Sequence, residues 1–437
     1  MIGNKIILGS AGNAGTSGPY WISTWGGSGA EYGVKIEIDS ADNIYVIGYT
    51  NSTGAGLNDV LITKYNSSGT IQWQRTLGGA SNDYGISIAI DSADNVYVAG
   101  YTNSTGAGGD DALIAKYNST GTLQWQRRLG GTGNDYGYGI AIDSADNIYV
   151  IGYTFSTGAG GSDFLITKYN SSGTIQWQRV LGGASSDYGR RIAIDSADNV
   201  YVAGSTFSTG AGGQDVLIAK YNSSGTIQWQ RTLGGAGTDA SEEIAIDSSD
   251  NIYIVGRTNS TGAGSYDLLI AKYNTSGTIQ WQRTLGGASD DYGNSIVIDS
   301  ADNIYVIGYT NSTGAGLNDF LIAKYNTSGT IQWQRVLGGV DHDVANSIAI
   351  DSSNNIYTVG YTSSTGAGGY DLLIAKLPND GTLTGTYGVW TYQSSALTDA
   401  TSSLTDSAAG LTSASSSLTD ASSSLTDLGI VQYFQIA

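Results

Sequence analysis

The stretch that decides the fold is residues 86–102, which read Ile-Ser-Ile-Ala-Ile-Asp-Ser-Ala-Asp-Asn-Val-Tyr-Val-Ala-Gly-Tyr-Thr. Its first part alternates apolar and small residues up to Asp91. Its second part is rich in β-branched and aromatic side chains, which are typical of strands. The Ser-Ala-Asp-Asn segment between them supplies residues that tight turns favour. The stretch therefore predicts two antiparallel strands joined by a hairpin.

This hairpin recurs at a constant interval of 52 residues, with no insertion or deletion. A tryptophan series that starts at Trp21 and a lysine series that starts at Lys64 follow the same period. The hairpin aspartates are Asp39, Asp91, Asp143, Asp195, Asp247, Asp299 and Asp351. A fixed period of this length indicates a repeat architecture, here with seven units over residues 21–384.

Each unit also contains two further strand-like segments, which in the second unit are residues 111–117 and 122–129. Helical periodicity is absent from the array. Four antiparallel strands per repeat are typical of a β-propeller, whose sheets pack on their neighbours and close into a ring. The strand around Trp21 precedes any complete unit, whereas the last unit has Gly385 where its tryptophan would stand. We therefore predict an all-β fold: a seven-bladed β-propeller of four-stranded antiparallel blades, closed by the N-terminal strand. An open solenoid is the alternative.

Three motifs carry a family resemblance: Trp73-Gln-Arg-Thr-Leu-Gly-Gly79, Asp83-Tyr-Gly85 and the hairpin of residues 86–102. Together they resemble the bacterial SBBP family of seven-bladed β-propeller repeats, over most of the chain. The resemblance implies the same fold. One departure is Asp94 and its equivalents, where the family has Gly at the turn. Family members are mostly surface or secreted proteins with poorly defined activity. The resemblance therefore implies little about function.

Composition excludes several function classes. Among 437 residues, 19 are Lys or Arg and 38 are Asp or Glu, which gives a net charge of −19. A chain this acidic repels nucleic acid and anionic membranes. The absence of cysteine removes disulfides and thiolate zinc sites, and a single histidine, His342, cannot form a histidine cluster. We therefore expect no nucleic-acid partner, no membrane insertion, no cofactor and no metal site.

Acidic residues recur in four series that begin at Glu31, Asp39, Asp42 and Asp59, and Asn354 replaces the acid in the last member of the Asp42 series. One interpretation is a ring of calcium sites, because hard oxygen ligands on loops suit that ion. The other is that the aspartates cap turns and pair with the basic Lys64 and Arg75 series; we favour the second. The tryptophan series could stack on sugars, but we expect it to pack between sheets.

The units differ most in the loop before the first strand and the loop after the second, which leave a four-stranded sheet at the same end. Binding residues concentrate on loops that a rigid scaffold holds. We therefore expect a ligand-binding face at the mouth of the central channel, with neutral drift as the alternative explanation. The candidate residues are Arg190, Arg191, Glu242, Glu243, Arg257, Tyr266, His342 and Tyr370.

The composition changes after residue 384, which suggests an N-terminal arm (1–18), a propeller (19–384) and a tail (385–437). Leucine recurs in the tail every seven residues, with a small residue or Leu428 three positions later. This spacing predicts a helix with a coiled-coil seam. Ser, Thr and Asp are poor helix formers, so the helix would need a partner, and a disordered tail is the alternative. The predicted oligomerisation seam is Leu397, Leu404, Leu411, Leu418, Leu425 and Leu428.

The first residues contain only three successive apolar side chains, too few for a signal-peptide core, although the composition is of an extracellular type. We therefore expect a non-enzymatic structural or adhesive module, most simply a bacteriophage virion protein such as a tail fibre, receptor-binding or capsid-decorating protein. Its expected partners are other virion proteins or copies of itself through residues 385–437, and a host surface glycan or protein. The alternative is a secreted or cell-surface bacterial adhesin or lectin. An enzyme, the third class, lacks an obvious acid–base constellation.

Overall fold

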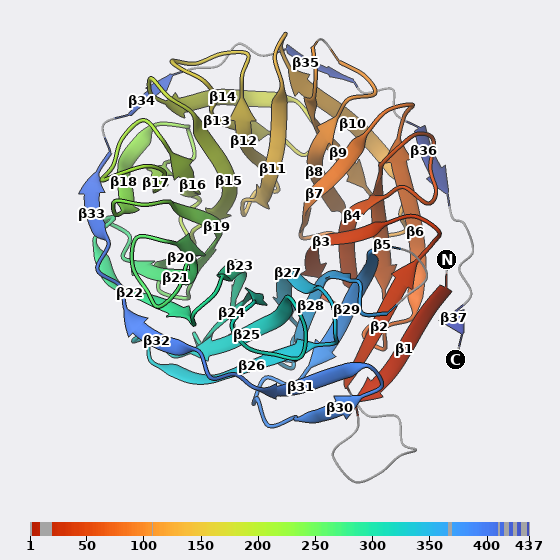
Figure 1. Cartoon of the computed structure of the whole chain (residues 1–437). Coiled ribbons are helices and arrows are strands. Elements are labelled where there is room, and N and C mark those ends of the chain that lie inside the picture. Colours follow the sequence, from red (N-terminus) through yellow and green to blue (C-terminus); the bar gives the residue numbers. More distant parts are fainter. Residues whose placement is uncertain are drawn as a thin grey trace.

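The computed structural model describes residues 2–8, 20–106, 108–365, 369–409, 411–414, 419–422, 426–429 and 435–436. Seven four-stranded antiparallel sheets, the blades, surround a central channel (Figure 1). The described residues include no helix, and therefore none long and apolar enough to cross a membrane.

The strands of each blade run outward from the channel in chain order. The innermost strands are β3 (Glu31–Ile38), β7 (Asp83–Ile90), β11 (Asp135–Ile142), β15 (Asp187–Ile194), β19 (Asp239–Ile246), β23 (Asp291–Ile298) and β27 (Asp343–Ile350). The second strands are β4 (Ile44–Thr50), β8 (Val96–Thr102), β12 (Ile148–Thr154), β16 (Val200–Thr206), β20 (Ile252–Thr258), β24 (Ile304–Thr310) and β28 (Ile356–Thr362). The third strands are β5 (Asp59–Tyr65), β9 (Asp111–Tyr117), β13 (Asp163–Tyr169), β17 (Asp215–Tyr221), β21 (Asp267–Tyr273), β25 (Asp319–Tyr325) and β29 (Asp371–Leu377). The fourth strands of blades 1 to 6 are β6 (Ile71–Gly78), β10 (Leu123–Gly130), β14 (Ile175–Gly182), β18 (Ile227–Gly234), β22 (Ile279–Gly286) and β26 (Ile331–Gly338).

The N-terminal strand closes the ring, as predicted. β2 (Tyr20–Gly26) is the fourth strand of blade 7 and pairs antiparallel with β29, with Trp21 opposite Lys376 and Trp25 opposite Leu372. The last blade is thus built from both ends of the array, which leaves no blade with three strands. The fold prediction is confirmed for the propeller and its closure.

The core consists of seven hydrophobic clusters, one at each junction between neighbouring blades. Between blades 1 and 2, Tyr45 and Ile62 meet Val98 and Tyr117, each with at most 2% of its surface exposed. Because each blade contributes one sheet face to each of two clusters, its strands read as nearly continuous apolar runs.

The turns that join the first and second strands form one face of the disc, which we call the hairpin face. Oδ1 of Asp39 accepts bonds from the backbone N–H groups of Ala41 (3.0 Å) and Asn43 (2.8 Å), and Oδ2 accepts from the Tyr45 hydroxyl (3.0 Å). Lys64 lies 3.4 Å from the same carboxylate. Burial alone raises the pKa of Asp39, but its hydrogen bonds from Asn43 and Tyr45 outweigh burial and hold that pKa below its usual value. The turn-capping interpretation of this series is confirmed.

The departure from the family pattern at Asp94 also has a structural role. Its φ of 58° lies in the left-handed region that normally favours glycine, and Asp tolerates it better than most residues. Its equivalents accept hydrogen bonds from the preceding blade: Ser196 donates from its backbone N–H (3.0 Å) and hydroxyl (2.8 Å) to Asp250. Ser352 of blade 7 donates in the same way to Asp42 of blade 1. Among the described residues, the one junction without this bond is that of blades 6 and 7, where Asn354 replaces the aspartate.

The tryptophan series packs between blades, as predicted, rather than facing a free surface. The Trp73 indole N–H donates to the Ser119 carbonyl of the next blade (3.2 Å), and its ring lies against Gly121. Gly121 has a φ of 78°, and a Cβ there would lie 2.8 Å from the indole, so the turn requires glycine. Arg75 covers the same ring and donates to the Gly121 carbonyl (2.6 Å).

The C-terminal region winds around the rim and adds a fifth strand to each of blades 1 to 6 (Figure 1). We call these added strands the belt: β31 (Trp390–Ser394), β32 (Thr398–Thr401), β33 (Thr405–Ala408), β34 (Thr412–Ala414), β35 (Thr419–Ser422) and β36 (Thr426–Gly429). The belt visits the blades in descending order, from blade 6 to blade 1. β30 (Gly385–Tyr387) pairs with β31, while β1 (Ile2–Leu8) extends blade 7 and pairs in parallel with β37 (Gln435–Ile436).

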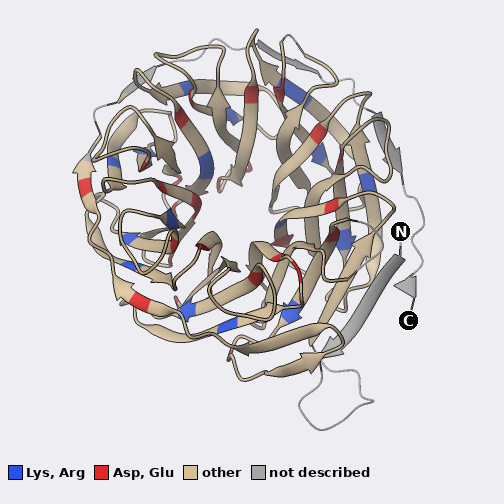
Figure 2. Cartoon of the chain, in the orientation of Figure 1, with Lys and Arg blue, Asp and Glu red and all other residues tan. Residues whose placement is uncertain are grey.

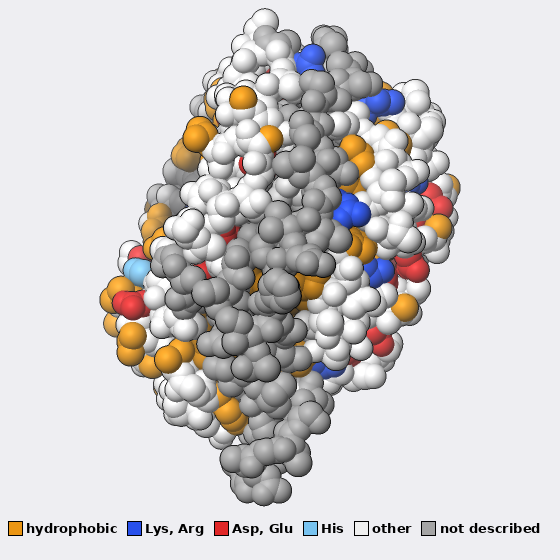
Figure 3. Space-filling model, turned by 90° about the vertical axis from the view of Figure 1, so that its right-hand side faces the viewer, with side chains coloured by type: hydrophobic (Ala, Val, Ile, Leu, Met, Phe, Trp, Pro, Cys, Tyr) orange, Lys and Arg blue, Asp and Glu red, His pale blue; other side chains and the backbone are white. Residues whose placement is uncertain are grey.

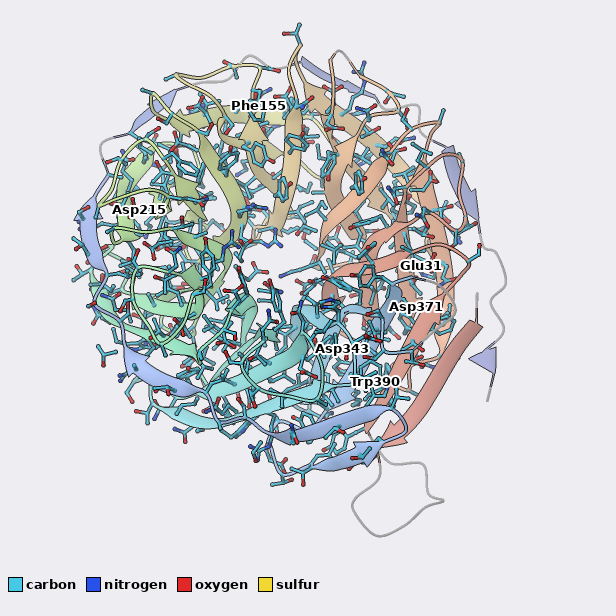
Figure 4. All side chains as sticks on the ribbon, viewed as in Figure 1. Glu31, Phe155, Asp215, Asp343, Asp371 and Trp390 are labelled. Carbon is cyan, nitrogen blue, oxygen red and sulfur yellow. The ribbon has the colours of Figure 1, made fainter. Side chains whose placement is uncertain are left out.

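Belt residues that are seven positions apart in the sequence pair with blade residues that are 52 positions apart. Tyr392 lies opposite Leu337 of blade 6, Asp399 opposite Leu285 of blade 5, and Asp406 opposite Leu233 of blade 4. The belt also joins neighbouring blades, because the Tyr273 hydroxyl of blade 5 donates to Asp406 on blade 4 (3.1 Å). Trp390 is fully buried at the junction of blades 6 and 7 (Figure 4).

The helical tail is therefore a wrong prediction for the described tail residues, which form strands. A spacing of seven residues between leucines fits the seam of a coiled-coil helix, and it fits equally well an extended chain that passes from one blade to the next every seven residues. The Ser, Thr and Asp residues between the leucines disfavour the helix. Leu397 and Leu404 are 6% exposed and fill the junctions of blades 5–6 and 4–5, and Leu411 packs at that of blades 3–4. Leu428 pairs with Thr76 through the backbone. The positions of Leu418 and Leu425 lie outside the described residues.

Candidate ligand-binding mouth of the central channel

The variable loops form the second face of the disc, which we call the mouth face. A buried acid beneath the loops of each blade holds them in place. Oδ2 of Asp83 accepts bonds from the Gly79 backbone N–H (2.8 Å) and the Ser104 hydroxyl (2.6 Å), and Asp59 accepts from the Gly56 N–H (3.2 Å). Glu31, Asp343 and Asp371 occupy the same layer at the loop ends of their strands (Figure 4). Burial raises the pKa of Asp163 and of Asp343 to about 6.

A β-bulge in every innermost strand aims two adjacent positions at the channel. In β15 the register with β16 shifts between Gly189 and Arg191, so Arg190 is the inserted residue. The same shift occurs in the other six innermost strands. A bulge bends its strand and redirects side chains, which explains why the positions that vary most lie at the channel mouth.

Two cavities are lined mainly by residues of the innermost strands around the channel. The cavity at the mouth has a volume of about 480 Å³, and Tyr101, Tyr138, Arg190 and Glu242 are among its lining residues. The cavity within the channel has a volume of about 370 Å³, and Lys35, Glu37 and Glu243 are among its lining residues. Arg191 lines both cavities and therefore lies between them.

Charged side chains at these two cavities come from blades 1, 4 and 5. Glu243 is 4% exposed and contacts both Lys35 and Arg191, the latter at 3.4 Å. Arg257 lies 2.7 Å from Glu242. Burial raises the pKa of Glu37 to about 7; Lys35 opposes this shift and Glu243 adds to it. Figure 2 shows basic residues of β15 at the channel wall.

Tyrosine side chains surround the mouth in a chain of ring contacts, which we call the tyrosine ring. Successive ring centroids are 4.8–5.2 Å apart, a spacing typical of aromatic pairs. Its members, in order, are Tyr361, Tyr32, Tyr49, Tyr84, Tyr101, Tyr136, Tyr153 and Tyr188. The chain of contacts stops at Tyr188 of blade 4, because Ser205 of the same blade stands where the next tyrosine would follow, and blade 5 has Ala240 and Arg257 at the two equivalent positions.

The mouth face also exposes large apolar side chains. Five of the six exposed large hydrophobic residues of the described chain lie on its loops: Leu57, Phe155, Phe207, Leu317 and Val340. In the edge-on view of Figure 3, hydrophobic side chains gather on the side of the disc that carries the single histidine. These loops are therefore a candidate interaction surface.

The structure brings most of the predicted face residues together. Arg190, Arg191 and Glu242 line the mouth cavity, and Glu243 lies directly below it. Arg257 lies over the rings of Tyr292 (5.4 Å) and Tyr266 (5.9 Å). Tyr370 contacts Tyr361 and Tyr32. His342 stands apart: its backbone exchanges hydrogen bonds with Ser363, and its side chain is not among those that line either cavity.

Sequence reasoning missed Lys35, Glu37 and the tyrosine ring. Glu37 stands where five other units have Ala and one has Val297, so its signal was a single exception at an otherwise apolar position. The tyrosines recur in most units, and a search for differences between units passes over what the units share.

Comparison with curated proteins finds distant relatives. An uncharacterized WD repeat-containing protein of Acanthamoeba polyphaga mimivirus is 23% identical over an alignment that covers 78% of this chain and 36% of that protein. The regulatory protein FlaEY of Caulobacter vibrioides is 24% identical over 68% of this chain and 38% of its own length. The chain thus spans little more than a third of either relative.

Solved structures similar to this chain include three propeller enzymes. A virginiamycin B lyase of Staphylococcus aureus is 13% identical, with a TM-score of 0.45 over 82% of this chain and 99% of its own. A gluconolactonase of Xanthomonas campestris is 11% identical (TM-score 0.39; 86% and 95%), and the polysaccharide lyase Uly1 is 10% identical (TM-score 0.47; 81% and 91%). The expectation of a non-enzymatic chain is contradicted by these neighbours, whose names are those of enzymes.

The family comparison agrees with the observed blades. The model of the SBBP beta-propeller repeat matches residues 72–106, 124–157, 176–209, 228–262, 280–314 and 332–366. A second propeller model, of a domain of unknown function, matches residues 196–227, 248–279 and 301–331. Each SBBP match begins in the fourth strand of one blade and ends after the second strand of the next. The chain belongs to the SBBP β-propeller repeat family.

Proposed function

We propose that this chain is a recognition module that binds a saccharide at the mouth of its central channel. The observation that carries the proposal is the tyrosine ring around a polar cavity of about 480 Å³. Aromatic rings stack on the apolar faces of sugars, while guanidinium, amide and carboxylate groups hydrogen-bond to sugar hydroxyls. Packed tyrosines lose little conformational entropy when a ligand binds, which favours affinity.

A glycan array with the purified chain tests this proposal. The seven units themselves supply fold-compatible variants: Tyr101→Ser places at blade 2 the residue of blade 4, Ser205, and Tyr84→Ala places there the residue of blade 5, Ala240. We expect each variant to weaken saccharide binding at least about tenfold, the contribution of one well-placed aromatic contact. Gln72→Ala, at an exposed position near the hairpin face, is the control. Binding that survives both tyrosine substitutions would contradict the proposal.

We further infer that the module is displayed on a virion, as a tail-fibre, receptor-binding or capsid-decorating protein, with a bacterial surface adhesin as the alternative. The exposed apolar residues of the mouth face support a role in display and attachment. The two relatives come from a virus and a bacterium and favour neither setting. Mass spectrometry of purified virions, beside immunogold labelling of producing cells, distinguishes the two. Copies of the chain or other virion proteins are the proposed structural partners.

Catalysis on the bound saccharide is the second candidate function, and Glu37 is the residue that favours it. Its carboxyl lines the inner cavity with Arg191, and burial brings its pKa to about 7, within the range that suits a general acid or base near neutral pH. Glu37→Ala restores the residue of five other blades. Cleavage of a bound oligosaccharide that disappears in this variant, while binding persists, would establish the activity.

A further inference from the structure

We propose that Arg190 binds the carboxylate of an acidic sugar, so that the saccharide recognised at the mouth contains uronic acid. The inference rests on the proposed saccharide-binding function and specifies its ligand class. The positions of the basic residues in this acidic chain, and the contacts that each of them makes, point to this ligand.

Most of the 19 Lys and Arg residues have structural roles that the repeats explain. Members of the Lys64 series pair with the Asp39 series on the hairpin face. Members of the Arg75 series lie over the tryptophans, and several donate to the turn of the next blade. Four basic residues outside these two series gather around the channel: Lys35, Arg190, Arg191 and Arg257.

Three of these four cations have carboxylate partners. Lys35 and Arg191 share Glu243, and Arg257 pairs with Glu242. The guanidinium of Arg190 lies over the Tyr138 ring, 5.0 Å from its centroid. Within the part of the chain that the structure describes, this guanidinium forms no direct hydrogen bond or ion pair. Burial disfavours its charged form, but the nearby Glu242 carboxylate and the surrounding tyrosines favour it and raise the pKa of Arg190. Arg190 is thus the mouth cation whose donors remain available to a ligand.

The position of Arg190 suits a carboxylate. A guanidinium carries its five N–H donors in one planar fork, and its contact with the Tyr138 ring uses none of them in a hydrogen bond. Arg190 also lines the mouth cavity, where a ligand would lie. A carboxylate has two coplanar oxygens that match this fork with two parallel hydrogen bonds. A sugar ring attached to that carboxylate would then lie among Tyr101 and Tyr138, which line the same cavity.

The charge of the whole chain makes this assignment specific. With a net charge of −19, most of the surface repels anions. The charged residues that line the mouth cavity are Arg190, Arg191 and Glu242, an excess of one positive charge. An acidic saccharide is therefore attracted to the mouth and repelled elsewhere, and its affinity falls as salt screens the attraction.

The test compares tetragalacturonic acid with its methyl ester, which keeps the sugar rings and removes the charge. A sulfated galactan oligomer and a glutamate oligopeptide provide other sources of anion. Calorimetry on the full chain is expected to show the acid binding at least about tenfold more tightly than the ester, because a charge-assisted bidentate pair is lost on esterification. Arg190→Asn, which places there the residue of blades 6 and 7 (Asn294 and Asn346), should remove this preference and leave ester binding unchanged.

Two further variants control for charge and fold. Arg190→Lys keeps the charge without the planar fork and should retain only part of the preference. Arg128→Thr removes a basic residue that contacts Asp111 on an outer strand and restores the residue of four other blades, so it should not alter binding.

The possible failures are distinguishable. Equal binding of acid and ester in the unaltered chain overturns the role of Arg190 and leaves saccharide recognition intact. Tighter binding of the sulfated oligomer overturns the carboxylate assignment, and tighter binding of the glutamate peptide overturns the saccharide. If neither the acid nor the ester binds, and the array is also blank, this inference and the proposed function fail together.

Discussion

The two ends of strand β19 contrast the two faces of the disc. Asp247, just beyond its hairpin end, is aspartate in all seven units, whereas Glu242, near its mouth end, is replaced by five other residue types in the six other units. Asp247 accepts hydrogen bonds from Asn251 and Tyr253 and contacts Lys272, so every blade requires it. Glu242 reaches into a cavity. Identity between repeats therefore marks packing, and difference marks the surface that is free to acquire a ligand.

The largest expected change in the free energy of unfolding is for a substitution at the hairpin end of β19. Asp247→Ala leaves Lys272, the Tyr253 hydroxyl and two backbone N–H groups without their acceptor, so the free energy of unfolding should fall by about 3 kcal/mol. Glu242→Asn, at the other end of the same strand, should cost less than about 1 kcal/mol because its pair with Arg257 is partly exposed. Denaturant unfolding of both variants measures the difference. Equal losses would show that the two faces do not differ in their contribution to stability.

The next largest expected effect is the dependence of stability on pH, to which two series of acidic residues contribute with opposite signs. Asp163 and Asp343 at the mouth face have pKa values raised to about 6, so the folded state binds their protons more tightly than the unfolded state does. Their effect makes stability fall as pH rises from about 4 to above 6. The Asp39 series has lowered pKa values, so its contribution is present above about 3.8 and is lost at lower pH.

Thermal unfolding should therefore give the highest Tm between about pH 4 and pH 5, with a lower Tm at pH 7.5. Asp343→Asn should flatten the decline above pH 5. A Tm that rises steadily from pH 4 to pH 7.5 would contradict the assignment of the raised pKa values to this series.

A smaller gain is expected where the ring of serine–aspartate bonds is interrupted. Asn354→Asp supplies the acceptor that Ser300 lacks and should raise stability by about 1 kcal/mol, the contribution of one partly exposed hydrogen bond to a charged group. The reciprocal variant Asp302→Asn, which weakens the bonds from Ser248, should lose a similar amount. If both changes leave Tm unaltered, these bonds do not contribute to closure of the ring.

The smallest change in stability is expected at Arg190. Arg190→Asn should alter the free energy of unfolding by less than about 0.5 kcal/mol, because two other blades already carry Asn and the substitution leaves no carboxylate without its partner. The same denaturant measurement checks this value. A large loss would make Arg190 a structural residue and would weaken its use as a binding probe.

Much of the fold could be predicted because its causes are local. The hairpin around Asp91 and the turn at Gly121 each need particular residues, and 52-residue spacing repeats those needs around the ring. The tail could not be predicted from period alone, because Leu397 and Leu404 satisfy a helical seam and a blade-to-blade step equally well. Its composition of Ser, Thr and Asp was the clue that favoured strands.

The mouth was predicted in part for a related reason. Differences between units identified Arg190 and Glu242, whose side chains reach the cavity. They also identified His342, which differs from its counterparts but lies outside both cavities. Which side chains meet across the channel depends on the closed ring: Lys35 of blade 1 reaches Glu243 of blade 5, four units away in the sequence.

The belt gives the chain a distinctive response to mechanical load. A pull on the C-terminal end acts first on short strands of three to five residues, each attached to a separate blade. These strands should detach one at a time, and each release should lengthen the chain by about 24 Å, the span of seven extended residues. In a force–extension trace, a series of small, evenly spaced drops in force would precede the unfolding of the propeller itself. A molecule tethered by this end could absorb sudden tension while its binding surface stays folded.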